Sequence, residues 1–215
     1  LKFANVRIEA ESASALYDTY HYDNAIAVGS VSDPEDEGGI GVNGCWDTNF
    51  AVYENVDLLD GAVEVAVRKN VPRSSAMEIW LDPQIDAENK GFSGGTKIAD
   101  VEFTVAAPAW TVWETFTAPV VGLPSGIHTV VLRFKSAGTT NHNQNLAGYN
   151  WIEFKAINNR GELQELQPVE GNVTVNKHLQ TQLEVRYVPE NALERDLVWS
   201  VVPSEPEGEA VVEVS

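Results

Sequence analysis

Short segments in which apolar residues alternate with other residues constrain the fold of this chain more than any other feature. Residues 63–67, 101–105 and 130–134 are clear examples. A period of two places successive side chains on opposite faces of a β-strand, so that one face becomes buried. Turn signals such as Asp60-Gly61 separate these segments, and no stretch of about 12 residues or more repeats with a helical period. The sequence therefore predicts an all-β sandwich.

The charge balance excludes two classes of partner. The 215 residues include 14 Lys and Arg against 32 Asp and Glu, which gives a formal net charge of −18. Binding to nucleic acid needs clustered cations, and binding to an anionic membrane surface needs a polybasic segment. We therefore expect neither a nucleic acid nor a membrane as a partner, and we expect a monomer.

Hydrophobic residues make up 43% of the chain, enough for a substantial core. No apolar run approaches the roughly 20 residues of a membrane-spanning helix, and no signal peptide precedes Leu1. We expect a secreted bacterial protein whose signal has been removed. The single cysteine, Cys45, rules out a disulfide within the chain, and the four scattered histidines do not suggest a metal cluster.

A change in composition near residues 156–161 indicates a domain boundary. We predict a first β domain at residues 1–157 and a second β unit at 158–215, with strand-like runs at 173–175, 183–187 and 197–201. At about 55 residues, this second unit is near the lower limit for independent folding. We interpret it as a truncated β-sandwich module.

The segment from Gly39 to Gly44 matches the dinucleotide-binding pattern GxGxxG literally. That site needs a strand before the glycines and a helix that begins at the last one. The residues that follow, Cys45-Trp46-Asp47, do not start such a helix. A glycine-rich loop is the better interpretation.

Glu9 and Glu11 lie two residues apart in a segment that we predict to be the first strand. In a strand their carboxylates share one face, about 7 Å apart. Three interpretations remain open: ligands of a hard cation such as calcium, a catalytic acid and base, or a solvated strand face in an acidic protein.

Six tryptophans are more than a core of this size requires. Trp110 and Trp113 are three residues apart and so face opposite sides of a strand, and we assign the exposed position to Trp110. Trp46 lies in a segment rich in Gly and Asn that we expect to be a loop. Exposed indoles on loops can stack on sugar rings, but the same residues can also be half-buried anchors.

A polar loop at residues 141–145 precedes Gly148-Tyr149-Asn150-Trp151. Its amides can donate to and accept from sugar hydroxyls, although asparagine clusters also form ordinary turns.

Seven motifs occur in a characteristic order: Ile8-Glu9-Ala10-Glu11, residues 49–57, 78–82 and 94–98, Trp110-Thr111-Val112-Trp113-Glu114-Thr115, residues 123–129, and Trp151-Ile152-Glu153-Phe154. With them, residues from about 6 to 155 resemble a family 6 carbohydrate-binding module. The resemblance implies a non-catalytic β-jelly roll attached to a polysaccharide-degrading enzyme.

In this family a sugar ring lies between two aromatic side chains in a loop cleft, and an asparagine at the start of the closing strand hydrogen-bonds the sugar. The resemblance assigns the first aromatic to Trp110 and the second to Trp46. Alignment on Trp151 puts Gly148 at the asparagine position, so the role passes to Asn150 or the 141–145 loop, and Tyr149 joins the predicted sugar-binding residues. Some members use a second cleft on the concave face, where this chain has Phe50 in place of Trp.

The resemblance also implies a structural calcium ion held by Glu9 and Glu11 together with a group on the closing strand, either Asn150 or Glu153. Residues from about 160 to 215 resemble a bacterial immunoglobulin-like module, carried by residues 163–168, 183–189 and 198–200.

We therefore predict the carbohydrate-binding portion of a secreted enzyme, covalently linked to a glycoside hydrolase or lyase domain. The negative charge favours a neutral glycan, such as a β-glucan, an agarose-type galactan or xylan, unless a local Lys/Arg patch overrides it. Two alternatives remain: a cell-surface adhesion module that binds protein through the Ig-like part, and a small glycosidase that uses a carboxylate pair.

Overall fold

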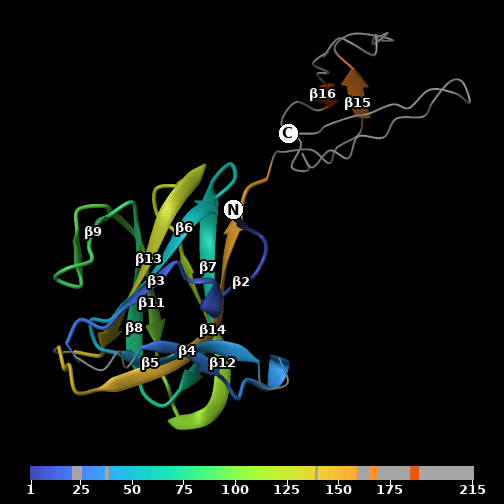
Figure 1. The fold of residues 1–215 in the computed structure, drawn as a ribbon. Coiled ribbons are helices and arrows are strands. Elements are labelled where there is room, and N and C mark those ends of the chain that lie inside the picture. The colour runs from blue at the N-terminus through green and yellow to red at the C-terminus, as the bar shows by residue number, and fades with distance from the viewer. Residues whose placement is uncertain (21–25, 37–38, 139, 159–164, 169–184, 189–215) are drawn as a thin grey trace, which may run out of the picture. The chain divides into compact units, whose positions relative to one another are not determined.

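A computed structural model describes residues 1–20, 26–36, 39–138, 140–158, 165–168 and 185–188. The chain divides into two units, Leu1–Asn158 and Asn159–Ser215. The described part of the first unit is built from β-strands with two short 3₁₀ turns, and its two main sheets form a sandwich (Figure 1). The all-β prediction is confirmed.

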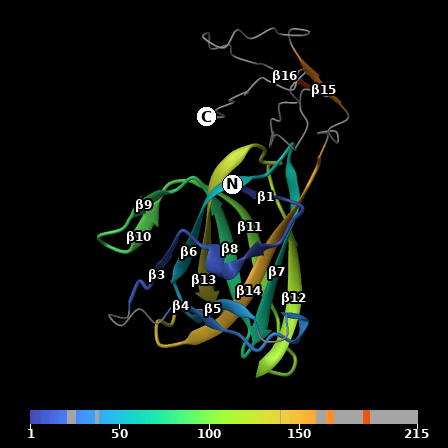
Figure 2. The ribbon, with the colours of Figure 1, turned by 45° about the vertical axis from the view of Figure 1, so that its right-hand side comes forward.

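The first sheet, sheet 1, has the strand order β1-β6-β13-β8-β11, with β3 also paired to β6. Its strands are β1 (Lys2–Phe3), β3 (Ala15–Tyr17), β6 (Phe50–Asp57), β8 (Ser75–Leu81), β11 (Thr96–Phe103) and β13 (Ile127–Ser136). The pair β1–β6 is parallel and the other pairs in this sheet are antiparallel. A hairpin of β9 (Gln84–Asp86) and β10 (Gly91–Ser93) follows β8 (Figure 2).

The second sheet, sheet 2, has the strand order β12-β7-β14-β5-β4, with β2 also paired to β14. Its strands are β2 (Ile8–Glu9), β4 (Ala27–Ser30), β5 (Ile40–Trp46), β7 (Ala62–Val71), β12 (Ala109–Pro119) and β14 (Asn145–Ala156). All its described pairs are antiparallel.

The core lies between the two sheets and follows the alternation in the sequence. Val65 and Val67 of β7 and Leu132 of β13 are fully buried in one apolar cluster. Val131 and Arg133, the neighbours of Leu132 on β13, point to the outer face of sheet 1, because successive strand residues alternate between faces. The period-two pattern thus determines which β13 side chains remain outside the core.

A buried salt bridge lies on the outer face of sheet 2. The Arg68 guanidinium donates to both carboxylate oxygens of Asp33, at 2.9 and 2.7 Å, and the Asn150 amide donates to the same group at 3.0 Å. Burial alone would raise the pKa of Asp33, but the hydrogen bonds from Arg68 and Asn150 lower it below its ordinary value. Asp33 immediately precedes the 3₁₀ turn Pro34–Asp36, so this ion pair fixes a connection over the sheet.

Lys69, the next residue on β7, points into the core instead. Its ammonium donates to the Ser75 hydroxyl at 2.9 Å and lies 4.1 Å from the centre of the Phe103 ring. Burial lowers the pKa of Lys69 from 10.5 to about 7.

Two local predictions were wrong. The segment expected to be a glycine-rich loop around Gly41 is strand β5, and Trp46 is its last residue rather than a loop residue. Glu9 and Glu11 do not share a strand, because β2 ends at Glu9 and Ala10–Ser12 form a 3₁₀ turn. The turn is needed because β2 pairs in sheet 2 whereas β3 pairs in sheet 1.

In the second unit, the described residues are β15 (Glu165–Pro168) and β16 (Val185–Val188), which pair antiparallel. β16 overlaps the run predicted at 183–187. The runs predicted at 173–175 and 197–201 lie outside the described residues.

Candidate functional site

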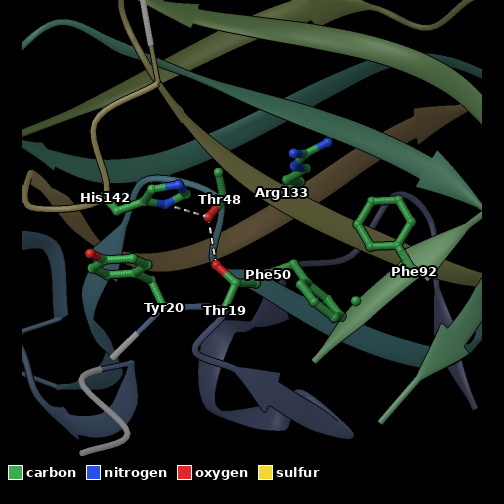
Figure 3. Close-up of a pocket in the computed structure, with 8 residues that line it drawn as sticks. Thr19, Tyr20, Thr48, Phe50, Phe92, Arg133 and His142 are labelled. Atoms are coloured by element: carbon green, nitrogen blue, oxygen red, sulfur yellow. Dashed lines mark hydrogen bonds between the residues drawn. The ribbon is translucent and has the colours of Figure 1, made fainter. Parts of the chain in front are cut away.

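A pocket of about 360 Å³ opens on the outer face of sheet 1 (Figure 3). Strand β6, strand β13, the hairpin strand β10 and three connecting segments contribute to it. Its lining residues are Thr19, Tyr20, Thr48, Phe50, Gly91, Phe92, Arg133 and His142. Its volume is at the small end of the roughly 300–1,000 Å³ typical of ligand sites.

The strand register places the base of the pocket. Tyr17 of β3, Phe50 of β6, Arg133 of β13 and Glu78 of β8 are direct cross-strand neighbours. Directly paired residues present their side chains on the same face. The outer face of sheet 1 therefore carries a row of side chains across the strands, in which Tyr17 and Phe50 are aromatic and Arg133 and Glu78 are charged.

Aromatic packing forms one side of the pocket. The Phe50 ring stacks on Tyr17, with centroids 4.6 Å apart, and meets Phe92 edge-on at 5.2 Å. Phe50 is only 1% exposed, whereas Phe92 on the hairpin is half-buried. Phe50 is therefore the base of the pocket, and Phe92 is the ring with surface available to a ligand.

A second aromatic pair lies on the opposite side. Tyr20 stacks on His142, with centroids 4.7 Å apart and an interplanar angle of 11°. The Thr48 hydroxyl lies 3.2 Å from His142 Nδ1 and 2.5 Å from the Thr19 hydroxyl (Figure 3). Rings and hydroxyls therefore meet along this wall.

The segment that carries His142 is held by a buried carboxylate. Asp47 accepts hydrogen bonds from the Ser136 amide at 2.9 Å, from the Ser136 hydroxyl at 2.8 Å, and from the Asn141 amide. These contacts hold the start of the connection between β13 and β14 at Ser136 and its middle at Asn141. His142 is thus positioned by the fold.

Arg133 is the strongest charge in the lining. Its side chain is 38% exposed, and Nη1 lies 3.7 Å from Glu78 Oε2, beyond hydrogen-bond distance. No Asp or Glu lines the pocket among the described residues. A carboxylate pair of the kind that cleaves glycosidic bonds is therefore not present in this lining.

Trp110 lies on a different surface, at the edge of sheet 2. The pairing of β12 with β7 skips from Ala109 to Trp113, so residues 110–112 bulge away from the sheet. Trp110 is 48% exposed and Trp113 is buried, as predicted.

The other predicted sugar-binding residues lie elsewhere. Trp46 is half-buried on β5, which is separated from β12 by β14 and β7. Tyr149 is 0% exposed, and its hydroxyl hydrogen-bonds the Tyr53 hydroxyl at 2.8 Å in the core. Asn150 is 1% exposed and donates to Asp33. The last two side chains therefore present no surface to a ligand in this structure, because β14 is an inner strand covered on both faces.

Gly148 explains why no side chain takes the asparagine position predicted from the resemblance. A Cβ atom at Gly148 would lie 2.6 Å from Oδ1 of Asn43, and the Gly148 amide donates to Asn70 at 2.8 Å. Asn43, a residue that the sequence did not single out, occupies the adjacent space.

The predicted calcium ligands are brought together only in part. Glu9 and Glu11 flank Ala10, whose carbonyl accepts the Tyr53 hydroxyl at 3.0 Å. Glu11 Oε2 is buried without a hydrogen-bond partner among the described residues, which is costly unless a cation or water satisfies it. No group of three or more His, Cys, Asp or Glu suited to a metal occurs in the described part of the chain, so Glu153 is not gathered with the other two.

The pocket residues were mostly missed at the sequence level. Phe50 was recognised as a second-cleft position, and His142 lies in the polar loop noted above. The contributions of Phe92 and Arg133 depend on the hairpin fold and the strand register, for which the sequence offers no local signal.

No protein-family model and no curated protein matches the sequence. In the described residues, no helix has the length and apolar character to cross a membrane.

Solved structures do match. A β-1,3-glucan-binding CBM6 from Bacillus halodurans is 25% identical, with a TM-score of 0.56 over 73% of this chain and 99% of that one. A family 6 carbohydrate-binding module from Clostridium cellulolyticum in complex with xylose is 28% identical, with a TM-score of 0.55 over 72% and 99%. CsCBM6-3 from Clostridium stercorarium in complex with cellobiose, 18% identical with a TM-score of 0.54 over 73% and 97%, shares the fold. Over 73% of its length, the chain is therefore similar in structure to family 6 carbohydrate-binding modules.

Proposed function

We propose that this protein is a non-catalytic carbohydrate-binding module and that its principal site is the pocket on the outer face of sheet 1. The observation that carries the proposal is the lining itself, in which ring surfaces, threonine hydroxyls and a guanidinium converge in a fold similar to that of carbohydrate-binding modules.

The two sides of the pocket suit the two chemical surfaces of a sugar. The half-buried ring of Phe92 and the Tyr20–His142 stack offer aromatic surface for C–H groups. Thr19, Thr48 and His142 supply groups that donate to and accept from hydroxyls. The size of the pocket suits a monosaccharide or disaccharide unit, so we expect weak binding per site.

Weak binding is useful when the module is tethered. We propose that the chain is part of a secreted enzyme, where it keeps a covalently linked glycoside hydrolase or lyase domain near its polysaccharide. The net charge of −18 favours a largely neutral main chain, such as a β-glucan, an agarose-type galactan or xylan. Trp110 would provide a second contact for a long polymer.

We also propose a structural calcium ion at the Glu9–Glu11 turn. Calcium takes six to eight oxygen ligands, so backbone carbonyls would supplement the two carboxylates. The unpartnered Glu11 oxygen supports this proposal. The ion would stabilise the crossing from β2 in sheet 2 to β3 in sheet 1.

Native affinity electrophoresis tests the function. The full chain is run in gels that contain laminarin, mixed-linkage glucan, agarose, xylan or alginate. We expect at least one polymer to retard the wild type, Phe92→Ala to abolish that retardation, and Val121→Ala to preserve it. Val121 is a matched apolar control because it is exposed and lies outside the pocket.

The alternatives predict other outcomes. An adhesion module that binds protein through the second unit predicts no retardation by any polymer. A small glycosidase predicts release of reducing sugar by this chain alone. Retardation that persists in Phe92→Ala but is lost in Trp110→Ala would move the site to the β12 bulge.

A further inference from the structure

We infer that the pocket selects a sugar that carries a carboxylate, such as a uronic acid residue, and that Arg133 is the residue that binds this group. The inference deepens the proposed function and rests on it. It refines the expectation of a neutral glycan: the main chain stays neutral, and one acidic residue enters the pocket.

The first observation is the charge of the lining. In a chain with 32 acidic residues, the pocket contains Arg133 and His142 but no Asp or Glu among the described residues. A carboxylate brought here meets a guanidinium directly, although the protein as a whole repels anions. Low-dielectric ring surfaces beside it strengthen that attraction.

The second observation is that the Arg133 guanidinium donates no hydrogen bond to a carboxylate among the described residues. The carboxylate nearest to it, Glu78, is buried and already accepts from Lys135 at 3.0 Å and from the Trp80 indole at 3.2 Å. The contact from Arg133 to Glu78 is 3.7 Å, and Lys97 lies 3.8 Å from the same carboxylate. Glu78 is thus shared among several cations, and it accepts no hydrogen bond from the guanidinium of Arg133.

The third observation is the position of the guanidinium. Its central carbon lies 5.9 Å from the centre of the Phe92 ring, so the two groups border the same space. A planar guanidinium matches a carboxylate by two parallel hydrogen bonds. A pyranose ring against Phe92 would bring the acid group at its C5 toward Arg133, and the ring hydroxyls would face Thr19 and Thr48.

The overall charge sets a limit on the ligand. A polymer with an acid on every residue would meet the field of the −18 chain at each repeat. An isolated acid on a neutral chain, as a side group or a chain end, meets only the local charge of the pocket. The structure therefore favours a sparsely acidic polysaccharide.

The test uses pairs of small sugars that differ only in the acid group. The ¹⁵N-labelled full chain is titrated by NMR with methyl glucuronide against methyl glucoside, and with methyl galacturonide against methyl galactoside. We expect at least one acid to bind about tenfold more tightly than its neutral partner, the size expected for a charge-assisted pair. Added salt should weaken the acid and leave the neutral sugar unchanged.

Two variants of equal charge change identify the residue. Arg133→Gln should reduce the affinity of the acid to that of the neutral sugar. Lys155→Gln, an exposed position on β14 in the other sheet, should have no effect.

Failure of the inference can be distinguished from failure of the proposed function. If the neutral sugars bind in the pocket as tightly as the acids, the inference is overturned and the proposed function stands. If no sugar shifts pocket resonances and no polymer retards the chain, both fall. If a galactoside 6-sulfate binds more tightly than either acid, the assignment to a carboxylate is wrong.

Discussion

The outer faces of the two sheets carry arginines in opposite circumstances. Arg68 on sheet 2 is almost completely buried and makes two hydrogen bonds to Asp33, while Arg133 on sheet 1 is half-exposed and has no hydrogen bond to a carboxylate among the described residues. The segment around Asp33 covers sheet 2, whereas the corresponding space on sheet 1 is a pocket. The difference indicates that the first arginine serves the fold and the second is available to a ligand.

The largest effect should come from breaking the buried pair. Arg68→Met leaves the Asp33 carboxylate buried and uncompensated, so we expect the free energy of unfolding to fall by about 3–5 kcal/mol. Urea denaturation of the full chain measures it. Arg133→Gln, which also removes an arginine charge but on the open face, should lower the free energy of unfolding by less than about 1 kcal/mol.

A double variant sharpens this result. Asp33→Leu combined with Arg68→Met removes both charges and should recover most of the loss. Similar costs for Arg68→Met and Arg133→Gln would contradict the proposed division of roles between the two faces.

Lys69 extends the comparison to a buried cation without a carboxylate among the described residues. Its folded pKa of about 7 lies below its ordinary value of 10.5, so between pH 7 and 10.5 the unfolded chain binds a proton that the folded chain does not. Stability should therefore rise with pH across this window and be constant below it with respect to this group.

Removing that group should be stabilising. We expect Lys69→Met to raise the free energy of unfolding at pH 7 by about 4 kcal/mol and to flatten the rise above pH 7. Urea denaturation at pH 6, 7, 8 and 9 measures both effects. An unchanged pH slope would show that Lys69 remains charged in the core.

Removal of the proposed calcium ion should have an intermediate effect. With calcium at about 50 times its Kd, chelation should lower the free energy of unfolding by about 2 kcal/mol. Glu11→Gln should remove the sensitivity to chelator, and Glu153→Gln should retain it, because Glu153 is not gathered with Glu9 and Glu11 in the described part of the chain. Calorimetry with and without EDTA checks this, and equal melting temperatures for the wild type would exclude a stabilising ion.

The smallest effect should come from Trp110. Trp110→Ala removes an exposed ring, so stability should change by less than about 0.5 kcal/mol. Binding of small sugars in the pocket should not change. The free energy of binding to a long polymer should weaken by about 1 kcal/mol, the low end for ring stacking, and retardation by that polymer should decrease accordingly. Val112→Ala, at an exposed neighbour in the same bulge, is the control.

Local sequence patterns predicted part of this structure. The alternation at residues 130–134 placed Leu132 in the core. The loop-like Ala-Ala-Pro-Ala segment before Trp110 predicted that this indole, and not Trp113, is the exposed one. The Glu-Ala-Glu segment was wrongly predicted to be straight, because a chain that passes from one sheet to the other must turn there.

By itself, the sequence determined the fold class and the outward direction of Arg133, because alternation acts between neighbours along one strand. Only the tertiary structure decided that Phe50, Phe92 and Arg133 share a pocket and that Tyr149 and Asn150 lie inside. Cross-strand register and the covering of a sheet face depend on segments far apart in the chain, and hydrophobic periodicity does not encode which of them meet.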